Sequence, residues 1–324
     1  MSRARRGSRL RVLTYHRVAE PRSRPHLSPA LVSATPETFE RQMRALRRDQ
    51  DVVSIGDVLA AVETGAGLPS RALLLTFDDA YHDLIEHAIP ILRGLALPAL
   101  VFVPTAFPGH PERSYWSDRL HHAFSVTAAR GLESPAGHLS LATPRERRES
   151  LRRLGQHLKT LPHREAAEAV ERACEELGVR PHGAKSVLDW DELRDLARSG
   201  IAVAAHSRSH ALLTRLSPSE VRAEISGARA DLERELGAAL PVFCYPNGSH
   251  DPSSVAILRE EGFRVAFTTL DGVNDLTRVD PLRLRRTNVT PRTGPARLRL
   301  RLTRFGAWLD AWRHRGASQR PHLA

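Results

Sequence analysis

The sequence predicts an α/β fold in which parallel strands alternate with helices. Short apolar runs of strand length alternate with longer segments whose apolar residues recur at helical spacing. Two of these apolar runs end directly in carboxylates or histidines, and the carboxyl ends of barrel strands are where such enzymes carry their chemistry. The length of 324 residues fits one barrel of about 250 residues plus an insertion.

The first part of this alternation precedes an unusual central segment. A helix is expected to begin at Pro36, because Thr35 followed by Pro36 has the order of an N-cap and a first helical residue. Strand, helix, strand is the signature of parallel α/β winding. The expected strands cover 11–16, 52–55, 73–77 and 99–103, and further helices cover 57–62 and 83–95.

Residues 107–187 break the pattern and predict a helical insertion over the mouth of the barrel. One helix is expected from Tyr115, followed by two charged amphipathic helices at 143–161 and 164–177. The alternation then resumes, with helices expected at 190–198, 218–236 and 253–261 and strands at 201–205, 242–245, 265–269 and 282–286.

We therefore divide the chain into a basic N-terminal segment with the first strand (1–24), a barrel (10–290) that contains the insertion (107–187), and a basic C-terminal segment (291–324). Residues 1–24 carry eight Arg and one Glu, and residues 281–324 carry eleven Arg and one Asp, so the remaining body has a net charge of −6 although the whole chain has +11. A uniformly basic nucleic-acid-binding protein has a different distribution, and no nucleic-acid partner is expected.

The sequence predicts a cytoplasmic protein. No stretch reaches the roughly 18 apolar residues of a membrane span, and the N-terminus lacks the apolar core of a secretory signal. Residues 296–315 place Leu and Trp at three- and four-residue steps between arginines. This pattern fits either a helix on the inner face of a membrane or a terminal helix that packs on the barrel. Cys174 and Cys244 have no CxxC spacing and are expected to be buried thiols.

Two pairs of polar residues carry the chemical signal. One apolar run ends in Asp78 and Asp79, and another ends in His206 and His210. Histidines four residues apart fall on one side of a helical turn, and adjacent strand residues point to opposite sides, which suits two roles for the two carboxylates. Each pair alone also fits a solvated surface. Together, one carboxylate and two histidines provide three ligands for a catalytic metal with open positions.

In the same order, residues 76–79 (TFDD), 206–210 (HSRSH) and 243–248 (FCYPNG) resemble the successive motifs of the polysaccharide deacetylase (NodB-homology) family. The opening at 13–18 (LTYHRV) is similar to a subgroup associated with bacterial surface polysaccharides. The resemblance covers about residues 10–290 outside the insertion. It implies a distorted (β/α)7–8 barrel, NodB-like and related to the TIM barrel, and metal-dependent removal of acetyl groups from sugars.

The resemblance also implies roles for individual residues. Asp79, His206 and His210 would hold a divalent metal, with Zn²⁺ the favoured ion, and Asp78 would be the general base. The chemistry agrees, because a metal-activated water needs a neighbouring carboxylate to accept its proton. Asn247 falls where the family uses a backbone N–H to hold the oxyanion, although an ordinary strand-ending turn fits the same residues.

The sequence departs from the family in two places. Cys244 stands where many members carry an arginine that pairs with the base, and no late Leu-x-His motif supplies an acid histidine. Arg286 is the candidate for the missing arginine, and a surface or phosphate-facing role is its alternative. His16 and His250 are candidates for the proton donor, and His16 also fits a structural histidine.

Other polar and aromatic residues near the motifs have simpler explanations. His82, Asp83 and His87 fit a helix start that is rich in acid and carries solvated histidines better than they fit further metal ligands. Tyr115 and Trp116 fit core positions better than a sugar-stacking surface.

These observations predict a carbohydrate deacetylase that acts on an acetylated amino sugar of a polysaccharide, glycolipid or precursor. A C–N hydrolase of the same fold acting on a non-sugar amide is the nearest alternative, and a non-catalytic protein that binds membrane or nucleic acid is another. The expected partner is an acetylated glycan or glycolipid, with membrane contact through 296–315 left open.

Overall fold

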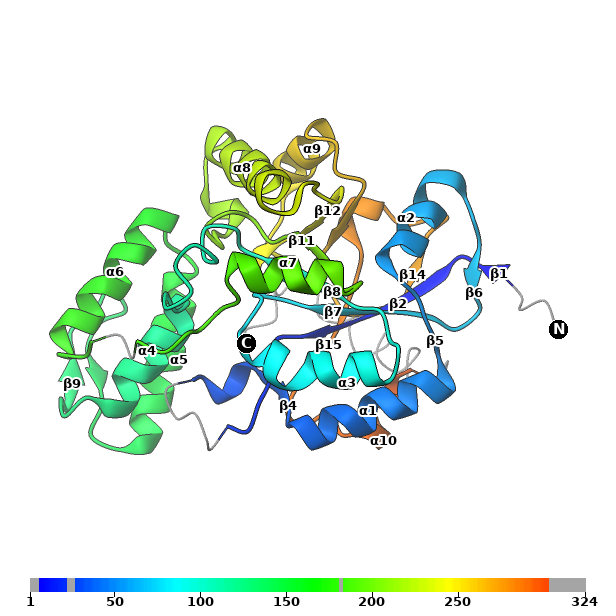
Figure 1. Cartoon of the computed structure of the whole chain (residues 1–324). Helices are drawn as coiled ribbons and strands as arrows, with labels where there is room; N and C mark the ends of the chain where they lie inside the picture. Colours follow the sequence, from blue (N-terminus) through cyan, green and yellow to red (C-terminus); the bar gives the residue numbers. More distant parts are fainter. Residues whose placement is uncertain (1–5, 22–26, 181–182, 303–324) are drawn as a thin grey trace.

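A curled sheet of parallel strands forms the centre of the molecule (Figure 1). The computed structural model describes residues 6–21, 27–180 and 183–302. Within these residues the sheet follows the order β13-β12-β11-β8-β7-β2-β14, with β5 paired to β7 and β15 paired to β2. The six strands from β13 to β2 are mutually parallel. They are β2 (Arg9–Tyr15), β7 (Ala72–Phe77), β8 (Leu100–Val103), β11 (Ala202–Ala205), β12 (Val242–Cys244) and β13 (Val265–Phe267).

The chain near residue 285 joins the two ends of this curl. Leu284 forms a parallel bridge with Phe267 of β13, and β15 (Thr287–Asn288) pairs in parallel with β2. β14 (Asn274–Asp275) is antiparallel to β2, and β5 (Asp51–Val52) is parallel to β7. The predicted α/β class and its barrel-like sheet are therefore confirmed.

The strand expected at 282–286 is wrong in detail. Pro281–Arg283 forms a 3₁₀ turn, and the strand begins only at Thr287. Asp280 caps the turn by accepting a hydrogen bond from the Leu282 N–H at 3.0 Å, and Pro281 has no N–H to donate to a ladder. The local turn chemistry of Asp-Pro thus overrides the alternating pattern that followed it.

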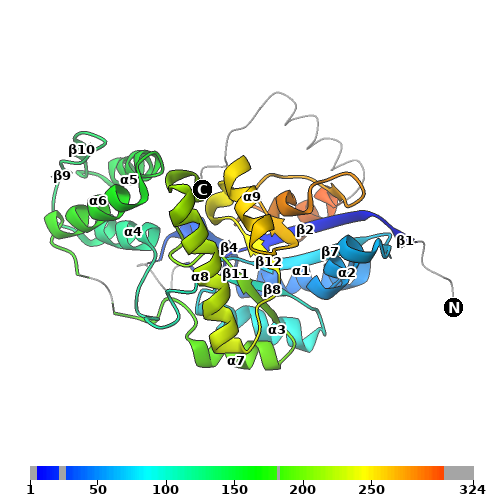
Figure 2. The ribbon, with the colours of Figure 1, turned by 90° about the horizontal axis from the view of Figure 1, so that it is seen from above.

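Helices surround the strands in the two views of Figures 1 and 2. Several begin where the sequence predicts, because a Ser or Thr side chain caps the first turn: Thr35 accepts from the Thr38 N–H, and Ser217 accepts from the Glu220 N–H. The helices are α1 (Pro36–Asp49), α2 (Ile55–Thr64), α3 (Ile89–Gly94), α7 (Trp190–Arg198), α8 (Pro218–Leu236) and α9 (Pro252–Glu260).

The helix expected at 83–95 is irregular. Residues Leu84–Ala88 form a π-helix, and the Ile89 N–H bonds to the Leu84 carbonyl before α3 continues the turn. Pro90 explains the interruption, since it lacks the N–H needed for the next bond of an α-helical ladder.

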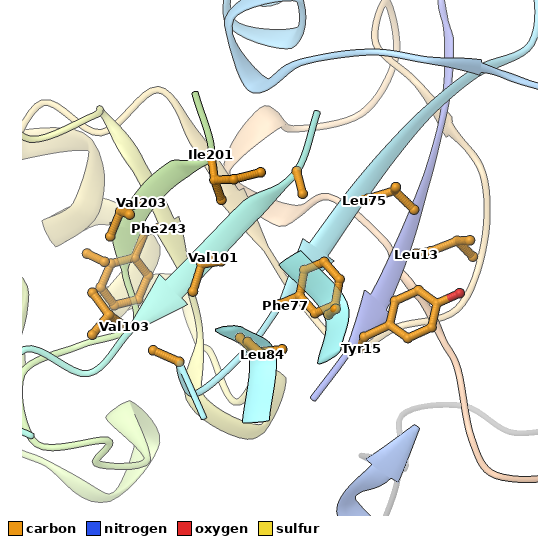
Figure 3. Packing of buried hydrophobic residues seen from close by; sticks show 14 of the residues in the cluster. Leu13, Tyr15, Leu75, Phe77, Leu84, Val101, Val103, Ile201, Val203 and Phe243 are labelled. Carbon is orange, nitrogen blue, oxygen red and sulfur yellow. The ribbon is translucent and has the colours of Figure 1, made fainter. Parts of the chain in front are cut away.

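Alternation along β7 sets which side chains face the interior of the curl. Leu73, Leu75 and Phe77 pack in the cluster formed with the surrounding helices (Figure 3). Leu74 belongs to a second cluster with residues of β2, β8 and β12. Side chains of a strand alternate between faces, so Thr76 and Asp78 follow Leu74 into the interior. The strand therefore delivers a carboxylate to the inside of the sheet at its carboxyl end.

The predicted helical insertion is present between β8 and α7, and Figure 1 shows it beside the barrel. It has its own hydrophobic cluster, which includes Leu120, Phe124, Leu154 and Val170. This separate core makes the insertion a distinct packing unit. Its elements are α4 (Trp116–Val126), β9 (Gly131–Leu132), β10 (Leu139–Ser140), α5 (Pro144–Leu158) and α6 (His163–Glu176).

The two basic ends of the chain are only partly described. The N-terminal strand β1 (Arg6–Gly7) pairs with β6 (Leu68–Pro69). Helix α10 (Pro295–Arg301) contacts α1, with Arg299 paired to Asp49 at 2.8 Å. Most of the amphipathic segment predicted at 296–315 lies outside the described residues, so its membrane contact stays a prediction. None of the helices in the described part of the chain is both long and apolar enough to cross a membrane.

Candidate active site

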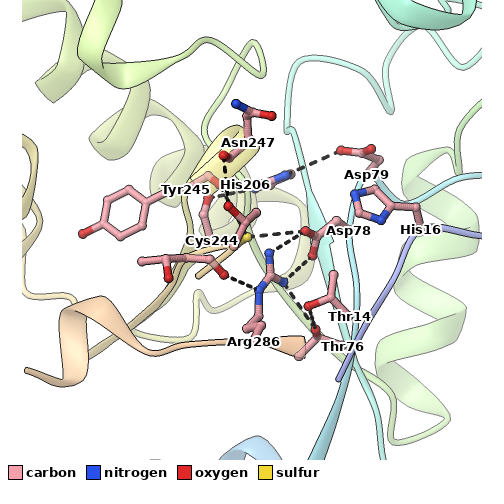
Figure 4. Close-up of polar contacts among 12 residues, drawn as sticks. Thr14, His16, Thr76, Asp78, Asp79, His206, Cys244, Tyr245, Asn247 and Arg286 are labelled. Atoms are coloured by element: carbon pink, nitrogen blue, oxygen red, sulfur yellow. Dashed lines mark hydrogen bonds and ion pairs between the residues drawn. The ribbon is translucent and has the colours of Figure 1, made fainter. Parts of the chain in front are cut away.

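Three predicted metal ligands come together at the carboxyl ends of β7 and β11. Asp79 Oδ1 lies 3.2 Å from His210 Nε2 and 3.5 Å from His206 Nε2 (Figure 4). The ligand atoms of all three residues lie within 4.8 Å of one another. Asp79 Oδ1 is buried yet makes no hydrogen bond of good geometry. A buried carboxylate oxygen needs a partner, and a divalent cation between these three atoms would supply it.

The loop geometry behind the two histidines differs from the expected helical turn. Residues 206–210 form no helix, and Ser207 and His210 have φ angles of 60° and 62°. Left-handed backbone is unfavourable for residues other than glycine. The two imidazole rings nevertheless meet edge to face with centroids 5.0 Å apart. The two rings thus lie together as the four-residue spacing predicted, but a strained loop rather than a helix brings them there.

The surroundings of His206 determine which of its ring nitrogens carries the proton. Nδ1 lies 2.8 Å from the Cys244 carbonyl oxygen, so the proton sits on Nδ1 and the lone pair of Nε2 faces Asp79. Burial lowers the pKa of His206 to about 4, which keeps the imidazole neutral at pH 7. Burial alone would raise the pKa of Asp79, but His210 and its neighbours hold it below the ordinary value. Both groups are therefore in the protonation state that a metal requires.

Asp78 forms a buried ion pair with Arg286. Arg286 Nη1 and Nη2 donate to Asp78 Oδ1 and Oδ2, each at 2.7 Å, and Nε donates to the Thr268 carbonyl at 2.8 Å. Burial raises the pKa of Asp78, but the Arg286 charge outweighs it and leaves that pKa below its usual value. The residue that the sequence offered as the missing arginine thus lies beside the predicted base.

A second group of potential metal ligands shares His206 with Asp78 and Cys244. This set is a poor metal site for two reasons. Burial raises the pKa of the Cys244 thiol well above its ordinary value, and both oxygens of Asp78 already accept hydrogen bonds from Arg286. A cysteine binds a metal as the thiolate, which the raised pKa of Cys244 disfavours. The Asp79 cluster is therefore the better candidate for a metal site.

The two candidate proton donors lie in different surroundings. His16 directly follows β2, and its backbone N–H donates to Ser33 Oγ at 2.9 Å. Its ring lies beside Asp79 in Figure 4. His250 is held at Nδ1 by the Gly248 carbonyl at 2.8 Å and at Nε2 by Arg283 at 3.3 Å. His16 is therefore placed to meet a group at the cluster, whereas both nitrogens of His250 are engaged elsewhere.

Asn247 occupies the tight turn after β12, with φ 54°. The next residue, Gly248, has φ 68°, and a Cβ placed on it would come within 2.2 Å of Thr269 Oγ1. Only glycine fits this close approach without a shift of the neighbouring segment. Thr269 Oγ1 also donates to the Asn247 carbonyl at 3.3 Å. The turn is therefore fixed against the segment that follows β13.

Comparison with known protein families decides the class of this chain. The family described as polysaccharide deacetylase matches residues 66–266, which is more than half of the 324 residues. The chain belongs to the polysaccharide deacetylase family. Its enzyme class is thus a carbohydrate deacetylase, and of the three functions that the sequence left open, family membership supports this one.

Solved structures share the fold of this polysaccharide deacetylase. Streptococcus pyogenes deacetylase PplD in complex with acetate is 16% identical, with a TM-score of 0.62 over 91% of this chain and 98% of that chain. IcaB from Ammonifex degensii is 20% identical, with a TM-score of 0.59 over 90% and 96%. The polysaccharide deacetylase BA0330 from Bacillus anthracis is 15% identical, with a TM-score of 0.60 over 91% and 69%. No curated protein matches the sequence.

Two contacts of the deacetylase site were not predicted by the sequence. The Tyr115 hydroxyl donates to the Asp79 carbonyl at 2.7 Å, and its ring meets His210 edge to face at 5.2 Å. Tyr115 is buried, as its core assignment predicted, but it also forms part of the wall of the metal-ligand cluster. A single aromatic residue 36 positions after the aspartate gives no local sequence signal of this contact.

Asp83 lies at the start of the helix, as the sequence predicted. It is fully buried, and its Oδ2 accepts from Arg17 Nε at 2.7 Å. Arg17 also donates to Asp118 of α4 at 3.2 Å, so one buried guanidinium connects the segment after β2, the π-helix and the insertion. His82 and His87 are half-buried beside acidic side chains. Contacts with distant segments account for Asp83 and His82, and His87 lies beside the adjacent Glu86, so these residues need no metal to explain them.

A carboxylate on α8 holds the loop that carries His210. Glu224 Oε2 accepts hydrogen bonds from the backbone N–H groups of Arg208 at 2.9 Å and Ser209 at 2.8 Å, and Oε1 accepts from Ser209 Oγ at 2.7 Å. Because the loop has two left-handed residues, these three bonds stabilise a conformation that the chain would otherwise leave. Glu224 therefore holds the loop that carries His210, a candidate metal ligand, from outside the cluster.

We expect Glu224→Gln to weaken metal affinity by about tenfold, within the range found for groups that orient metal ligands. The amide oxygen of glutamine can still accept from the two backbone N–H groups, but a neutral oxygen accepts more weakly than a carboxylate, so the loop loses part of its support. Metal affinity is measured by competition with a chromophoric chelator. Glu233→Gln is the matched control, since Glu233 is an exposed residue of the same helix that pairs with Arg229. Equal affinities for both variants would contradict the assigned role.

Proposed function

We propose that this deacetylase is a metal-dependent hydrolase that removes the acetyl group from an acetylated amino sugar within a glycan, a glycolipid or a precursor. Asp79, His206 and His210 would hold the metal, and Asp78 would act as the general base. The observation that carries the proposal is the buried three-ligand cluster directly beside the Asp78–Arg286 pair.

The donor set suits Zn²⁺, since two neutral imidazoles and one carboxylate with open positions are typical of catalytic zinc. Iron, cobalt or nickel also accept these ligands, so the ion in the cell is part of the test. When bound, the metal would lower the pKa of a water and polarise the acyl oxygen. The remaining chemistry belongs to side chains and backbone of this chain.

Asp78 would accept the proton of the attacking water. Arg286 fixes both of its oxygens in one plane and keeps it ionised, so the carboxylate is oriented and ready to accept. The same pairing weakens Asp78 as a base. Arg286 stabilises the ionised form of Asp78 and lowers its pKa, so protonation of Asp78 is less favourable; the fixed geometry offsets this cost.

Two further groups would complete the reaction. The backbone N–H of Asn247, in the turn after β12, would donate a hydrogen bond to the oxyanion that develops as water adds to the acetyl carbonyl. His16 beside Asp79 is the candidate to give a proton to the leaving amine. Loss of that amine as a neutral group requires such a donor.

The proposal is tested by metal content and acetate release on the same preparations. Wild-type protein should contain about one divalent ion per chain and release acetate from N-acetylated oligosaccharides. Removal of the ion with a chelator should stop the release, and adding it back should restore it. Asp79→Asn should lose the metal, because the remaining two ligands bind weakly.

Asp195→Asn serves as the control, since Asp195 is an exposed residue of α7 paired with Arg198. A wild-type protein that binds no divalent ion would overturn the metal assignment. Metal-bound protein that releases acetate from O-acetylated but not N-acetylated sugars would overturn the choice of amino sugar alone.

A further inference from the structure

The helical insertion reaches the deacetylase site at two points. Tyr115, at the start of α4, donates to the Asp79 carbonyl. Lys159, directly after α5, donates from Nζ to Asn247 Oδ1 at 3.3 Å. Figure 4 places Asp79 and Asn247 on either side of the His206 ring. The insertion therefore contacts both the metal-ligand cluster and the turn proposed to hold the oxyanion.

Lys159 is an unusual cation in this chain. It and Lys185 are the two lysines of the sequence, in which Lys and Arg together number 48. Lysine carries a compact ammonium on a flexible stem, whereas arginine presents a wide planar fork. The chain has arginine at most of its cationic positions, but the position beside Asn247 has lysine, with its compact ammonium.

The backbone of Lys159 is anchored so that its side chain points to the turn. Its carbonyl accepts a hydrogen bond from Arg215 Nε at 3.1 Å, which joins the end of α5 to the segment before α8. Ser249, two residues after Asn247, is joined to Thr214 of the same segment by a 2.6 Å hydroxyl contact. Thr214 and Arg215 thus hold both the turn and the backbone of Lys159. The side chain of Lys159 is half-buried and reaches from that anchor to Asn247.

We propose that Lys159 is a positioning residue through which the insertion fixes the Asn247 turn. This inference rests on the proposed oxyanion role of Asn247. Thr269 and Gly248 hold the turn from the barrel side, and Lys159 holds it from the insertion side through the Asn247 carboxamide. Negative charge develops next to the turn only in the transition state, so a turn loosened by loss of the Lys159 contact lowers kcat and leaves KM nearly unchanged.

A double-mutant cycle tests this role. We expect Lys159→Met to lower kcat by about tenfold, less than removal of an oxyanion donor itself, while Lys159→Arg keeps part of the rate. Asn247→Gly removes the contacted carboxamide but tolerates the left-handed backbone. If Lys159 acts through Asn247, the double variant is no slower than Asn247→Gly alone. Lys185→Met, which removes the other lysine, leaves kcat unchanged.

Hydrogen exchange of the backbone amides at 247–249 gives a second readout that needs no turnover. We expect these amides to exchange faster in Lys159→Met than in wild type or Lys185→Met, with the metal content of all three proteins equal. Additive losses in the cycle, a change in KM alone, or unchanged exchange would each overturn the role. If the wild type releases no acetate from any glycan, the proposed function fails, and the exchange comparison still decides whether Lys159 fixes the turn.

Discussion

Asp78→Asn should lower kcat for acetate release by about 10²–10⁴-fold, the usual contribution of a general base. Asparagine has nearly the same shape as aspartate and still accepts a hydrogen bond from Arg286, but it cannot take a proton from water. The Asp79 cluster is untouched, so the metal content should remain that of the wild type. Acetate release and elemental analysis of the same preparation measure the two quantities.

Either of two results would contradict the role of Asp78. Asp78→Asn protein that retains most of its activity would show that another group accepts the proton. Protein that loses its metal together with its activity would place Asp78 among the ligands, as in the alternative cluster with His206 and Cys244. Circular dichroism is the control that the fold is kept.

Arg286→Met should destabilise the protein by about 3–5 kcal/mol, because removal of one partner leaves the other charge buried and unpaired. Both side chains of the pair are almost fully buried, with 1% and 4% of their surface exposed. Methionine fills much of the arginine volume, so the loss reports mainly on charge. Chemical unfolding measures the change in the free energy of unfolding.

The neighbouring residue provides the control for this experiment. Arg285→Met changes the same kind of side chain one position away, but Arg285 is exposed and should cost well under 1 kcal/mol. The double variant Arg286→Met/Asp78→Asn should recover part of the stability, since no unpaired charge is then buried. A stability of Arg286→Met equal to that of Arg285→Met would show that the pair contributes nothing net.

The parts of the site that lie at strand ends were predictable from the sequence. Asp78, Asp79 and His206 each follow an apolar run directly, and period-two burial with parallel pairing brings such positions to one edge. Helix starts were also predictable, because Thr35 and Ser217 are N-cap residues that can be recognised from the local sequence.

Contacts between distant segments were not predictable in this way. Glu224 lies in the middle of an amphipathic helix, where glutamate is ordinary, and only the fold reveals the loop it holds. Arg17, Asp83 and Asp118 meet from three segments through two buried ion pairs that no spacing encodes. The loop of His210 was misjudged because its left-handed residues are serine and histidine, which carry no glycine signal.

The closing of the sheet by its last strand determines when the site becomes complete during folding. Asp78 and its partner Arg286 are 208 positions apart, and β15 must reach β2 across nearly the whole sequence before the guanidinium arrives. Contacts of such long range form late, since loop closure must be offset first. A nascent or partly folded chain therefore holds an uncompensated carboxylate at its centre. The docking of β15 on β2 and the pairing of Arg286 with Asp78 therefore take place in the same step of folding.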